Sequence, residues 1–201
     1  ISDNESNKIM TGELFEIKGN ELRVISLDGH RISIRKIYMK DSYENKKVIV
    51  PGKTLNEIIK ILSGEVSSMV QIFFTEKHAL FEFDDTVVLT RLIEGEYYRI
   101  DQMLSSDYET KVSINKKELQ SCIERASLLI RETDKKPIII DIKNNNFELK
   151  INTAIGSMNE EIDITMERKD IVIGFNPKFL LDALRVIDDE TVDIYLINAK
   201  A

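Results

Sequence analysis

The sequence predicts an α+β protein built from antiparallel sheets that carry helices on one side. Three observations lead to this prediction: stretches of period-2 alternation typical of strands, three amphipathic helical stretches, and a similarity between the two halves of the chain. A chain of 201 residues holds one large domain or two of ordinary size. We expect two domains, over residues 1–108 and 109–201, joined by an irregular segment that ends near Tyr108.

The first predicted strands form a hairpin near the start of the chain. Leu22, Val24 and Ser26 alternate with Arg23, Ile25 and Leu27, a period-2 pattern that indicates a strand, and Ile32 and Ile34 resume the alternation after the turn. Between the two strands Asp28 and Gly29 supply a turn, because glycine accepts a positive φ without a Cβ clash. Gly29, His30 and Arg31 at the end of a hairpin could recognise a peptide or an anion, whereas an ordinary surface hairpin is the simpler interpretation of these residues alone.

Three helices are predicted, over residues 53–62, 116–130 and 176–187, because apolar residues recur there at helical spacing. Ser113 or Asn115 would cap the second helix. The first helix would present an apolar face made of Leu55, Ile58, Ile59 and Leu62. Residues 1–8 and 37–47 are predicted to be polar connections, and further strands are predicted over 48–50, 68–74, 78–83, 86–92, 138–151, 171–173 and 192–197.

The second half of the chain repeats the first. Ile17 recurs as Ile142, 125 positions later, and the strand 48–50 recurs as 171–173, 123 positions later. In both halves the later strand leads directly into a helix. Offsets that agree this closely indicate a duplicated unit, and a duplication dictates the architecture.

Composition limits the class of protein. Hydrophobic residues make up 42% of the chain and charged residues 31%, which describes a globular protein and not a disordered one. The net charge of −7 argues against a generic basic nucleic-acid binder. No apolar run approaches the roughly 18 residues that a membrane-spanning helix needs. The single cysteine, Cys122, and the lack of a charged-then-apolar leader favour a reducing compartment, so we expect a cytoplasmic location.

Basic side chains lie opposite the apolar face on each predicted helix. For any one helix a solvated face is the simpler interpretation. The recurrence on all three, in a protein that is acidic overall, suggests instead that charge is sorted by surface, with basic helices on one side and acidic residues elsewhere. These basic residues are Lys53, Lys60, Lys116, Lys117, Arg125, Lys178 and Arg185.

Enzymatic motifs are missing from the sequence. The only histidines are His30 and His78, which excludes a site with three histidine ligands. Neither a Walker loop, nor a G-x-G-x-x-G fingerprint, nor a C-x-x-C pair occurs. Ser26, Asp28 and His30 fall on one turn with nothing to order them as a triad. We therefore predict no catalytic residue, no metal and no cofactor, and a β-rich interaction module without a DNA role stays open as the alternative.

Four stretches together carry a resemblance to a known family: Leu14–Lys36, Val48–Leu62, Arg91–Leu104 and Gly174–Leu184. In order and over essentially the whole chain, the sequence resembles the bacterial DNA polymerase III β subunits, the sliding clamps. The resemblance implies most of the middle and C-terminal domains of a three-domain subunit. It also implies that the first domain, the first strand and helix of the middle domain, and the last strands and tail lie outside this chain.

The resemblance implies a head-to-tail homodimeric ring around duplex DNA, with antiparallel sheets outside and helices on the inner face. Such a ring tethers the replicative polymerase and needs no base readout, so a weakly basic lumen suffices. The basic helix residues named above would face the DNA. Leu128 and Leu129 match dimer-interface positions of the family.

The family also binds short linear peptides, in a groove between the middle and C-terminal domains. The peptides come from the DNA polymerase III alpha subunit, the clamp loader and repair proteins. Apolar side chains would form the pockets, Gly29 would allow close approach of a backbone, and Arg31 would offer fixed donors. Carried over by position, the groove would consist of Met10, Leu27, Gly29, His30, Arg31, Ile32, Tyr98, Gln102, Met103, Asn176, Phe179 and Lys200.

Overall fold

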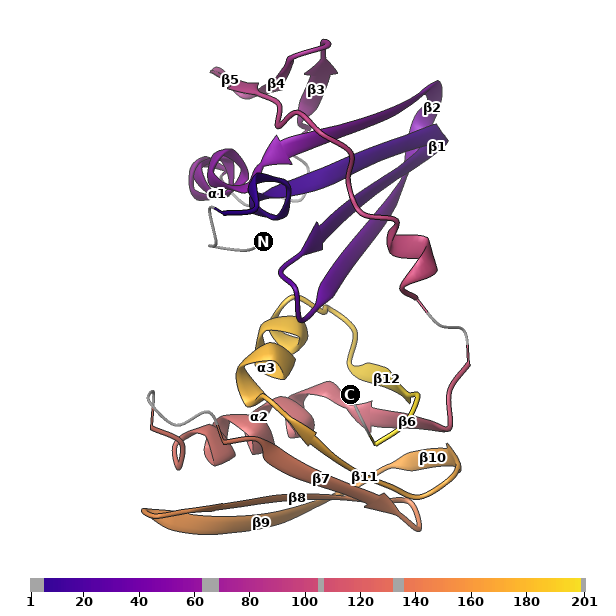
Figure 1. The fold of residues 1–201 in the computed structure, drawn as a ribbon, viewed down its shortest axis with the longest axis vertical. Coiled ribbons are helices and arrows are strands. Elements are labelled where there is room, and N and C mark those ends of the chain that lie inside the picture. Colours follow the sequence, from indigo (N-terminus) through magenta and orange to yellow (C-terminus); the bar gives the residue numbers. More distant parts are fainter. Residues whose placement is uncertain (1–5, 63–68, 105–106, 132–135, 200–201) are drawn as a thin grey trace. The chain divides into compact units, whose positions relative to one another are not determined.

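The chain folds into two compact units, Ile1–Ile100 and Asp101–Ala201, in a computed structural model (Figure 1). The structure describes residues 6–62, 69–104, 107–131 and 136–199. The division lies ahead of the boundary expected at 108/109. Ile100 is still buried in the first unit, at 3% exposure, and the first strand of the second unit begins only at Thr110.

Unit 1 contains two antiparallel sheets and one α-helix. A hairpin of two long strands, β1 and β2, forms the first sheet, and the second sheet has the order β3-β4-β5. The elements are a short 3-10 helix (Lys8–Thr11), β1 (Gly12–Leu27), β2 (Ile32–Pro51), α1 (Gly52–Ile61), β3 (Gln71–Phe74), β4 (His78–Phe83) and β5 (Thr86–Arg91). Another 3-10 helix, Ile100–Gln102, contains the division between the units.

The polar connection predicted over 37–47 is wrong, because these residues belong to β2. Their backbone pairs with β1, as in Leu22 with Ile37 and Glu16 with Lys47. Most of their side chains are exposed, so no alternation of burial marks the strand in the sequence. The pairing register shifts on either side of Gly19, whose φ of +60° is easily adopted only by glycine.

Helix α1 confirms the predicted helix within one residue at each end, but its predicted apolar face is only partly buried. Ile58 is 4% exposed, whereas Ile59 is 68% exposed. The helical periodicity therefore predicted burial for Ile59, but no side chain in the described part of unit 1 covers it.

Unit 2 contains a four-stranded sheet, β11-β7-β8-β9, and a three-stranded sheet, β10-β6-β12. Helices α2 and α3 lie on one side of the four-stranded sheet (Figure 1) and share a single core with it. The elements are β6 (Thr110–Asn115), α2 (Lys116–Ser127), β7 (Ile138–Lys143), β8 (Asn146–Thr153), β9 (Gly156–Asp163), β10 (Thr165–Arg168), β11 (Ile171–Phe175), α3 (Pro177–Arg185) and β12 (Thr191–Leu196). The α+β class with antiparallel sheets and helices on one side is thereby confirmed.

Equivalent residues pair with each other in the strands of both units, as the duplication predicts. Leu14 pairs with Ile49 in unit 1, and 125 positions later Ile139 pairs with Gly174 in unit 2. The long strand β1 thus corresponds to β7 and β8, and β2 corresponds to β9, β10 and β11. The same offset relates the other end of the hairpin, where Leu22 and Ile37 correspond to Phe147 and Ile162.

The duplication also explains the exposed residue on α1. With the offset of 125, Ile59 corresponds to Leu184 on α3, which is 5% exposed and packs in the core that contains α2. Unit 1 has no helix in the place of α2 among its described residues. Ile59 is exposed because that neighbour is absent from the described part of the chain.

Candidate functional site

The turn between β1 and β2 is held rigid by one carboxylate. Asp28 Oδ1 accepts hydrogen bonds from the backbone N–H groups of His30 and Arg31, each at 3.2 Å. Arg31 Nε donates to Asp28 Oδ2 at 2.6 Å. Gly29 sits between them with a φ of +88°, in the left-handed region that favours glycine. The sequence prediction of a turn over 28–31 is confirmed.

These contacts set the charge of Asp28. Partial burial acts to raise its pKa, but the hydrogen bonds from Arg31 and from the backbone of His30, together with the Arg31 charge, lower the pKa below its usual value. The carboxylate is therefore ionised at neutral pH and fixes the Arg31 guanidinium at the end of the hairpin. A fixed guanidinium loses little conformational freedom when it meets a ligand.

Apolar side chains expected in the peptide groove lie beside this turn. Leu27 is buried, and Met10, Ile32 and Tyr98 pack partly buried against the same cluster. The Tyr98 hydroxyl accepts a hydrogen bond from Asn7 Nδ2 at 2.7 Å. The structure therefore brings together the predicted residues of unit 1, with His30 and Gly29 exposed at the turn.

Tyr97 is a further member of this cluster that the sequence did not single out. It is 8% exposed, and its ring packs edge-on against Tyr98 with centroids 6.1 Å apart. Burial, followed by the nearby Glu13 carboxylate, raises the pKa of Tyr97 to about 12. Tyr97 is therefore a neutral phenol buried in the same apolar cluster.

The predicted groove residues of unit 2 lie at its start and on α3. Gln102 and Met103 are exposed at the end of the 3-10 helix. Asn176 caps α3: its Oδ1 accepts from the backbone N–H of Lys178 at 3.0 Å, and its carbonyl accepts from Phe179 at 3.1 Å. Asn176 thus has a structural task whether or not it contacts a ligand. Lys200 lies outside the described residues.

The basic residues expected to face DNA differ in their contacts with protein groups. Lys53 and Lys60 are exposed on α1, and Lys60 pairs with Glu57 at 2.7 Å. Lys116 donates to the carbonyl of Ile187 at 2.6 Å, which ties the start of α2 to the end of α3. Lys116 is consequently a structural contact in unit 2.

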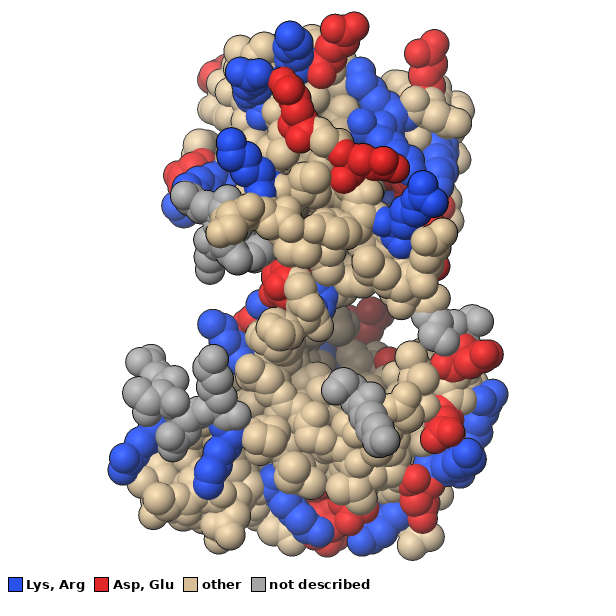
Figure 2. Space-filling model, in the orientation of Figure 1, with Lys and Arg blue, Asp and Glu red and all other residues tan. Residues whose placement is uncertain are grey.

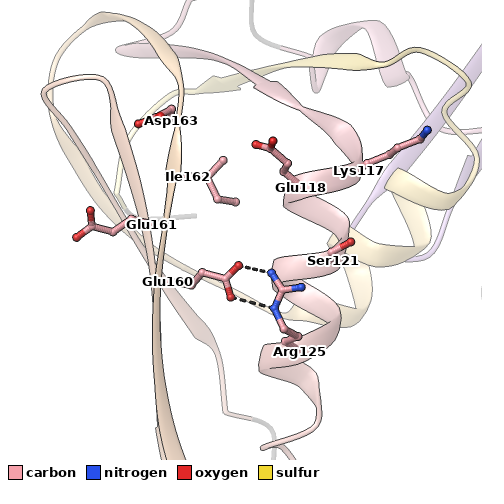
Figure 3. A pocket seen from close by; sticks show the side chains of 8 residues that line it. All are labelled: Lys117, Glu118, Ser121, Arg125, Glu160, Glu161, Ile162 and Asp163. Carbon is pink, nitrogen blue, oxygen red and sulfur yellow. Dashed lines mark hydrogen bonds and ion pairs between the residues drawn. The ribbon is translucent and has the colours of Figure 1, made fainter.

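Arg125 on α2 is neutralised by a carboxylate of β9. Its guanidinium forms a bidentate ion pair with Glu160, as Figure 3 shows. The two residues border a pocket of about 560 Å³ between α2 and β9, which is also lined by Lys117. The other carboxylates around it belong to Glu118, Glu161 and Asp163.

This pocket corrects the expectation that charge is sorted by surface. On the face of α2 that carries Lys117 and Arg125, Glu118 belongs to the same helix and Glu160 of β9 pairs with Arg125, so cations and anions share it. Figure 2 likewise shows Lys and Arg beside Asp and Glu on both units. The pairing of Arg125 with Glu160 had no signal in the sequence, because the partners are 35 residues apart on different elements.

On α3, the exposed Lys178 and Arg185 border a second hollow, and Arg185 lies 3.8 Å from Glu124 of α2. At the end of α2, the two leucines expected at the dimer interface differ in exposure. Leu128 is 80% exposed, whereas Leu129 packs against the core and would contact a Cβ added at Gly156. Of the two, only Leu128 is largely exposed.

Among the described residues, no group of three His, Cys, Asp or Glu side chains is placed to hold a metal ion. His30 lies in the hairpin turn and His78 begins β4, so they share no site.

No helix in the described ranges is long and apolar enough to cross a membrane. Cys122 is fully buried, and burial raises the pKa of its thiol to about 11.

Comparison with known proteins agrees with the duplicated fold. The family model of the DNA polymerase III beta subunit central domain matches residues 1–98, and that of its C-terminal domain matches residues 101–201. The chain is 35% identical to the "Beta sliding clamp" of Staphylococcus epidermidis and 36% identical to that of Staphylococcus aureus, in each case over 196 residues. These matches cover 96% of this chain and 52% of each relative, so the chain spans about half the length of the curated relatives it matches.

Solved structures give the same result. A crystal structure from Eubacterium rectale assigned to the DNA polymerase III beta subunit has a TM-score of 0.97 and 64% identity, and covers 100% of this chain and 55% of that one. The DNA polymerase sliding clamp of Bacillus subtilis has a TM-score of 0.94 and 30% identity, and covers 99% and 53% respectively. The resemblance found in the sequence is confirmed: the chain belongs to the DNA polymerase III beta subunit family, the sliding clamps.

Proposed function

We propose that the protein containing this chain is a sliding clamp that encircles duplex DNA and holds the replicative polymerase on its template. The observation that carries the proposal is the match of two successive clamp domains, in order, over the whole chain. Relatives over the same region are named sliding clamps. We further propose that the protein is non-catalytic and acts in the cytoplasm. A β-rich interaction module without a DNA role is not favoured.

Encirclement makes weak contacts to DNA sufficient. A ring cannot leave a closed duplex by breaking phosphate contacts, so these contacts can be few and sensitive to salt, which permits sliding. The exposed Lys117 and Lys178 suit such contacts, whereas Arg125 and Lys116 are held by protein groups. A net charge of −7 is compatible with this mechanism, although it is unfavourable for a simple DNA binder.

We also propose that the cluster beside the β1–β2 turn forms part of a groove for short peptides of the polymerase alpha subunit, the clamp loader and repair proteins. Met10, Leu27 and Ile32 supply apolar contacts next to the fixed guanidinium of Arg31. A Cβ at Gly29 would meet no atom within 4 Å, so a peptide backbone has room to approach there. Asn176 and Phe179 of unit 2 are proposed to complete the groove.

A homodimer is proposed for the full-length protein, with Leu128 in its interface. A leucine that is 80% exposed at the end of a helix is costly to leave in water and suits an apolar partner surface. The chain's relatives are about twice its length, so the complete protein is needed to test ring formation.

A primer-extension assay tests the proposed function. The full-length protein, loaded by its clamp loader with its own polymerase, should lengthen the product made in one binding event, and omission of the protein should restore short products. Product lengths that do not depend on the protein would reject the tethering role. Polymerase with clamp loader alone is the control.

A further inference from the structure

A row of charged side chains crosses the β1–β2 sheet of unit 1. Lys47 lies directly opposite Glu16 in the pairing of the two strands, and Lys36 lies opposite Arg23. Arg23 Nε is 3.4 Å from a carboxylate oxygen of Glu16, so the two cross-strand pairs are neighbours on one face. These four residues form the cationic row. None of them belongs to the proposed groove or to the helices expected to face DNA.

Glu16 holds the cations of this row in place. Its side chain is only 3% exposed, and it meets Lys47 at 2.8 Å, Lys18 at 3.2 Å and Arg23 at 3.4 Å. The Lys47 and Lys18 side chains are nevertheless 66% and 52% exposed. An ammonium group has three donors, so a lysine that donates to Glu16 can still donate to a ligand in solvent.

Positive charge exceeds negative charge on this surface. Lys36 is exposed and makes no ion pair within the described residues. Glu21, two residues before Arg23 on the same strand, is a second acid on this face. With Lys18 beside the row, four cations share two carboxylates. The surface therefore favours an anionic ligand.

The equivalent row of unit 2 has the opposite sign, so the duplicated sheet does not require cations here. With the offset of 125, it consists of Val172, Asp141, Glu148 and Glu161, which are paired in this order across β11, β7, β8 and β9. The nearby Lys143 and Lys150 neutralise part of this acid. The positive row is thus a property of unit 1 alone.

The cationic row lies on the same face of the sheet as the apolar cluster beside the β1–β2 turn. Arg23, Ile25 and Leu27 are two residues apart along β1, and residues so spaced in a strand point to one face. Ile25 and Leu27 belong to the apolar cluster, and Leu27 is also a residue of the proposed groove. At about 3.4 Å per residue, Arg23 is roughly 14 Å from Leu27 along the strand.

We propose that the cationic row binds acidic residues that flank the anchor motif of a peptide held in the groove. The inference rests on the proposed function of that groove. About five residues of extended chain span the distance, so Asp or Glu side chains beyond the anchor can reach the row. Contacts of this kind are exposed, so each is weak and sensitive to salt, and several together adjust which peptides bind best.

Fluorescence anisotropy with the full-length protein and three labelled peptides tests this inference. One is a plain peptide from the polymerase alpha subunit, and the other two carry an added Gly-Gly-Glu-Glu-Glu-Glu segment at one terminus or the other. At low salt, one of the extended peptides should bind about fivefold more tightly than the plain peptide. The gain should disappear at about 1 M salt, where exposed charges are screened.

Two variants of the row should abolish most of this gain and leave the affinity for the plain peptide unchanged. The first is Lys36→Gln with Lys47→Gln. The second, Lys36→Glu, keeps every contact of Glu16, so its effect cannot come from a disturbed buried ion pair. Lys60→Gln with Lys77→Gln is the control, because it removes two exposed lysines elsewhere in unit 1 and should keep the gain.

The outcomes separate this inference from the groove itself. If the plain peptide binds and neither extension improves its affinity, or if the control loses the gain as the row variants do, the inference is overturned and the groove stands. If the plain peptide does not bind, the groove is rejected and the inference with it. If a short DNA duplex displaces the extended peptide and the Lys36 variants lose duplex binding, the ligand of the row is nucleic acid and the inference is rejected.

Discussion

Glu16 and Asp141 occupy the same position in the two units, 125 residues apart, and each pairs with the lysine two residues later. Glu16 lies 3.2 Å from Lys18, and Asp141 lies 3.1 Å from Lys143. The environments differ, because the Glu16 side chain is only 3% exposed and also meets Lys47 at 2.8 Å. The duplicated fold therefore repeats an ion pair and buries it more deeply in unit 1.

Replacing Glu16 by Gln should destabilise unit 1 by about 2 kcal/mol, because a buried carboxylate that faces three cationic side chains is lost and the largely buried Arg23 loses this counter-charge. Arg23 is the partner most affected, since its side chain is only 11% exposed. Urea unfolding followed by circular dichroism measures the change. Glu44→Gln, on the exposed part of β2, is the control and should change stability by less than about 0.5 kcal/mol. Equal effects of the two substitutions would show that the buried network is not stabilising.

The same carboxylate predicts a pH dependence. Burial alone would raise the pKa of Glu16, but hydrogen bonds from Lys47 and Lys18 and their charges lower it below 4.5. A carboxyl whose pKa is lower in the folded state contributes stability above its unfolded pKa and loses it as the pH falls through the folded value. Stability of the wild type should thus decline below about pH 4.5, and Glu16→Gln should remove part of that decline. Parallel curves for the two proteins would contradict this.

Replacing His30 and Arg31 by Ala should weaken the binding of a polymerase-derived peptide about tenfold, because the fixed guanidinium and the exposed imidazole are lost. Fluorescence anisotropy with a labelled peptide measures the affinity. His78→Ala with Arg91→Ala removes the same residue types at the paired strands β4 and β5 and should leave binding unchanged. A similar loss in both double variants would mean that peptide binding depends on general charge.

Substitution of Leu128 by Lys in the full-length protein should shift the dimer toward monomer, since a charge would have to be buried unpaired in the interface. Sedimentation velocity gives the oligomeric state. Val186→Lys places the same charge at another exposed apolar position of unit 2 and should leave the dimer intact. Leu129→Lys should instead lower the stability of unit 2, because Leu129 packs against its core. An unchanged sedimentation coefficient for Leu128→Lys rejects the interface.

Local chemistry explains what the sequence predicted well. Asp28 and Gly29 specify their turn through a side-chain acceptor and a positive φ, and Asn115 specifies the start of α2 by accepting from the Glu118 backbone at 3.1 Å. β6 escaped prediction although its signal was present. Its buried residues Thr110, Val112 and Ile114 alternate with less buried ones.

Tertiary context explains what the sequence could not predict. Residues 37–47 form a strand whose side chains are mostly exposed, so no alternation of polar and apolar residues indicated a strand there. Ile59 obeys the helical pattern, but whether it is buried depends on a neighbouring helix that periodicity does not report. The free or paired state of each basic residue likewise depends on carboxylates brought near by folding, as Glu160 is brought to Arg125.

The central claim is that the full-length protein encircles DNA, and its most direct test is retention on a closed circle. Labelled protein is loaded onto a nicked circular duplex, washed at high salt, and followed by gel filtration before and after the circle is cut once. Encirclement predicts that the protein stays on the circle and dissociates after linearisation, because it slides off the new ends. Equal loss from circular and linear DNA would contradict the account.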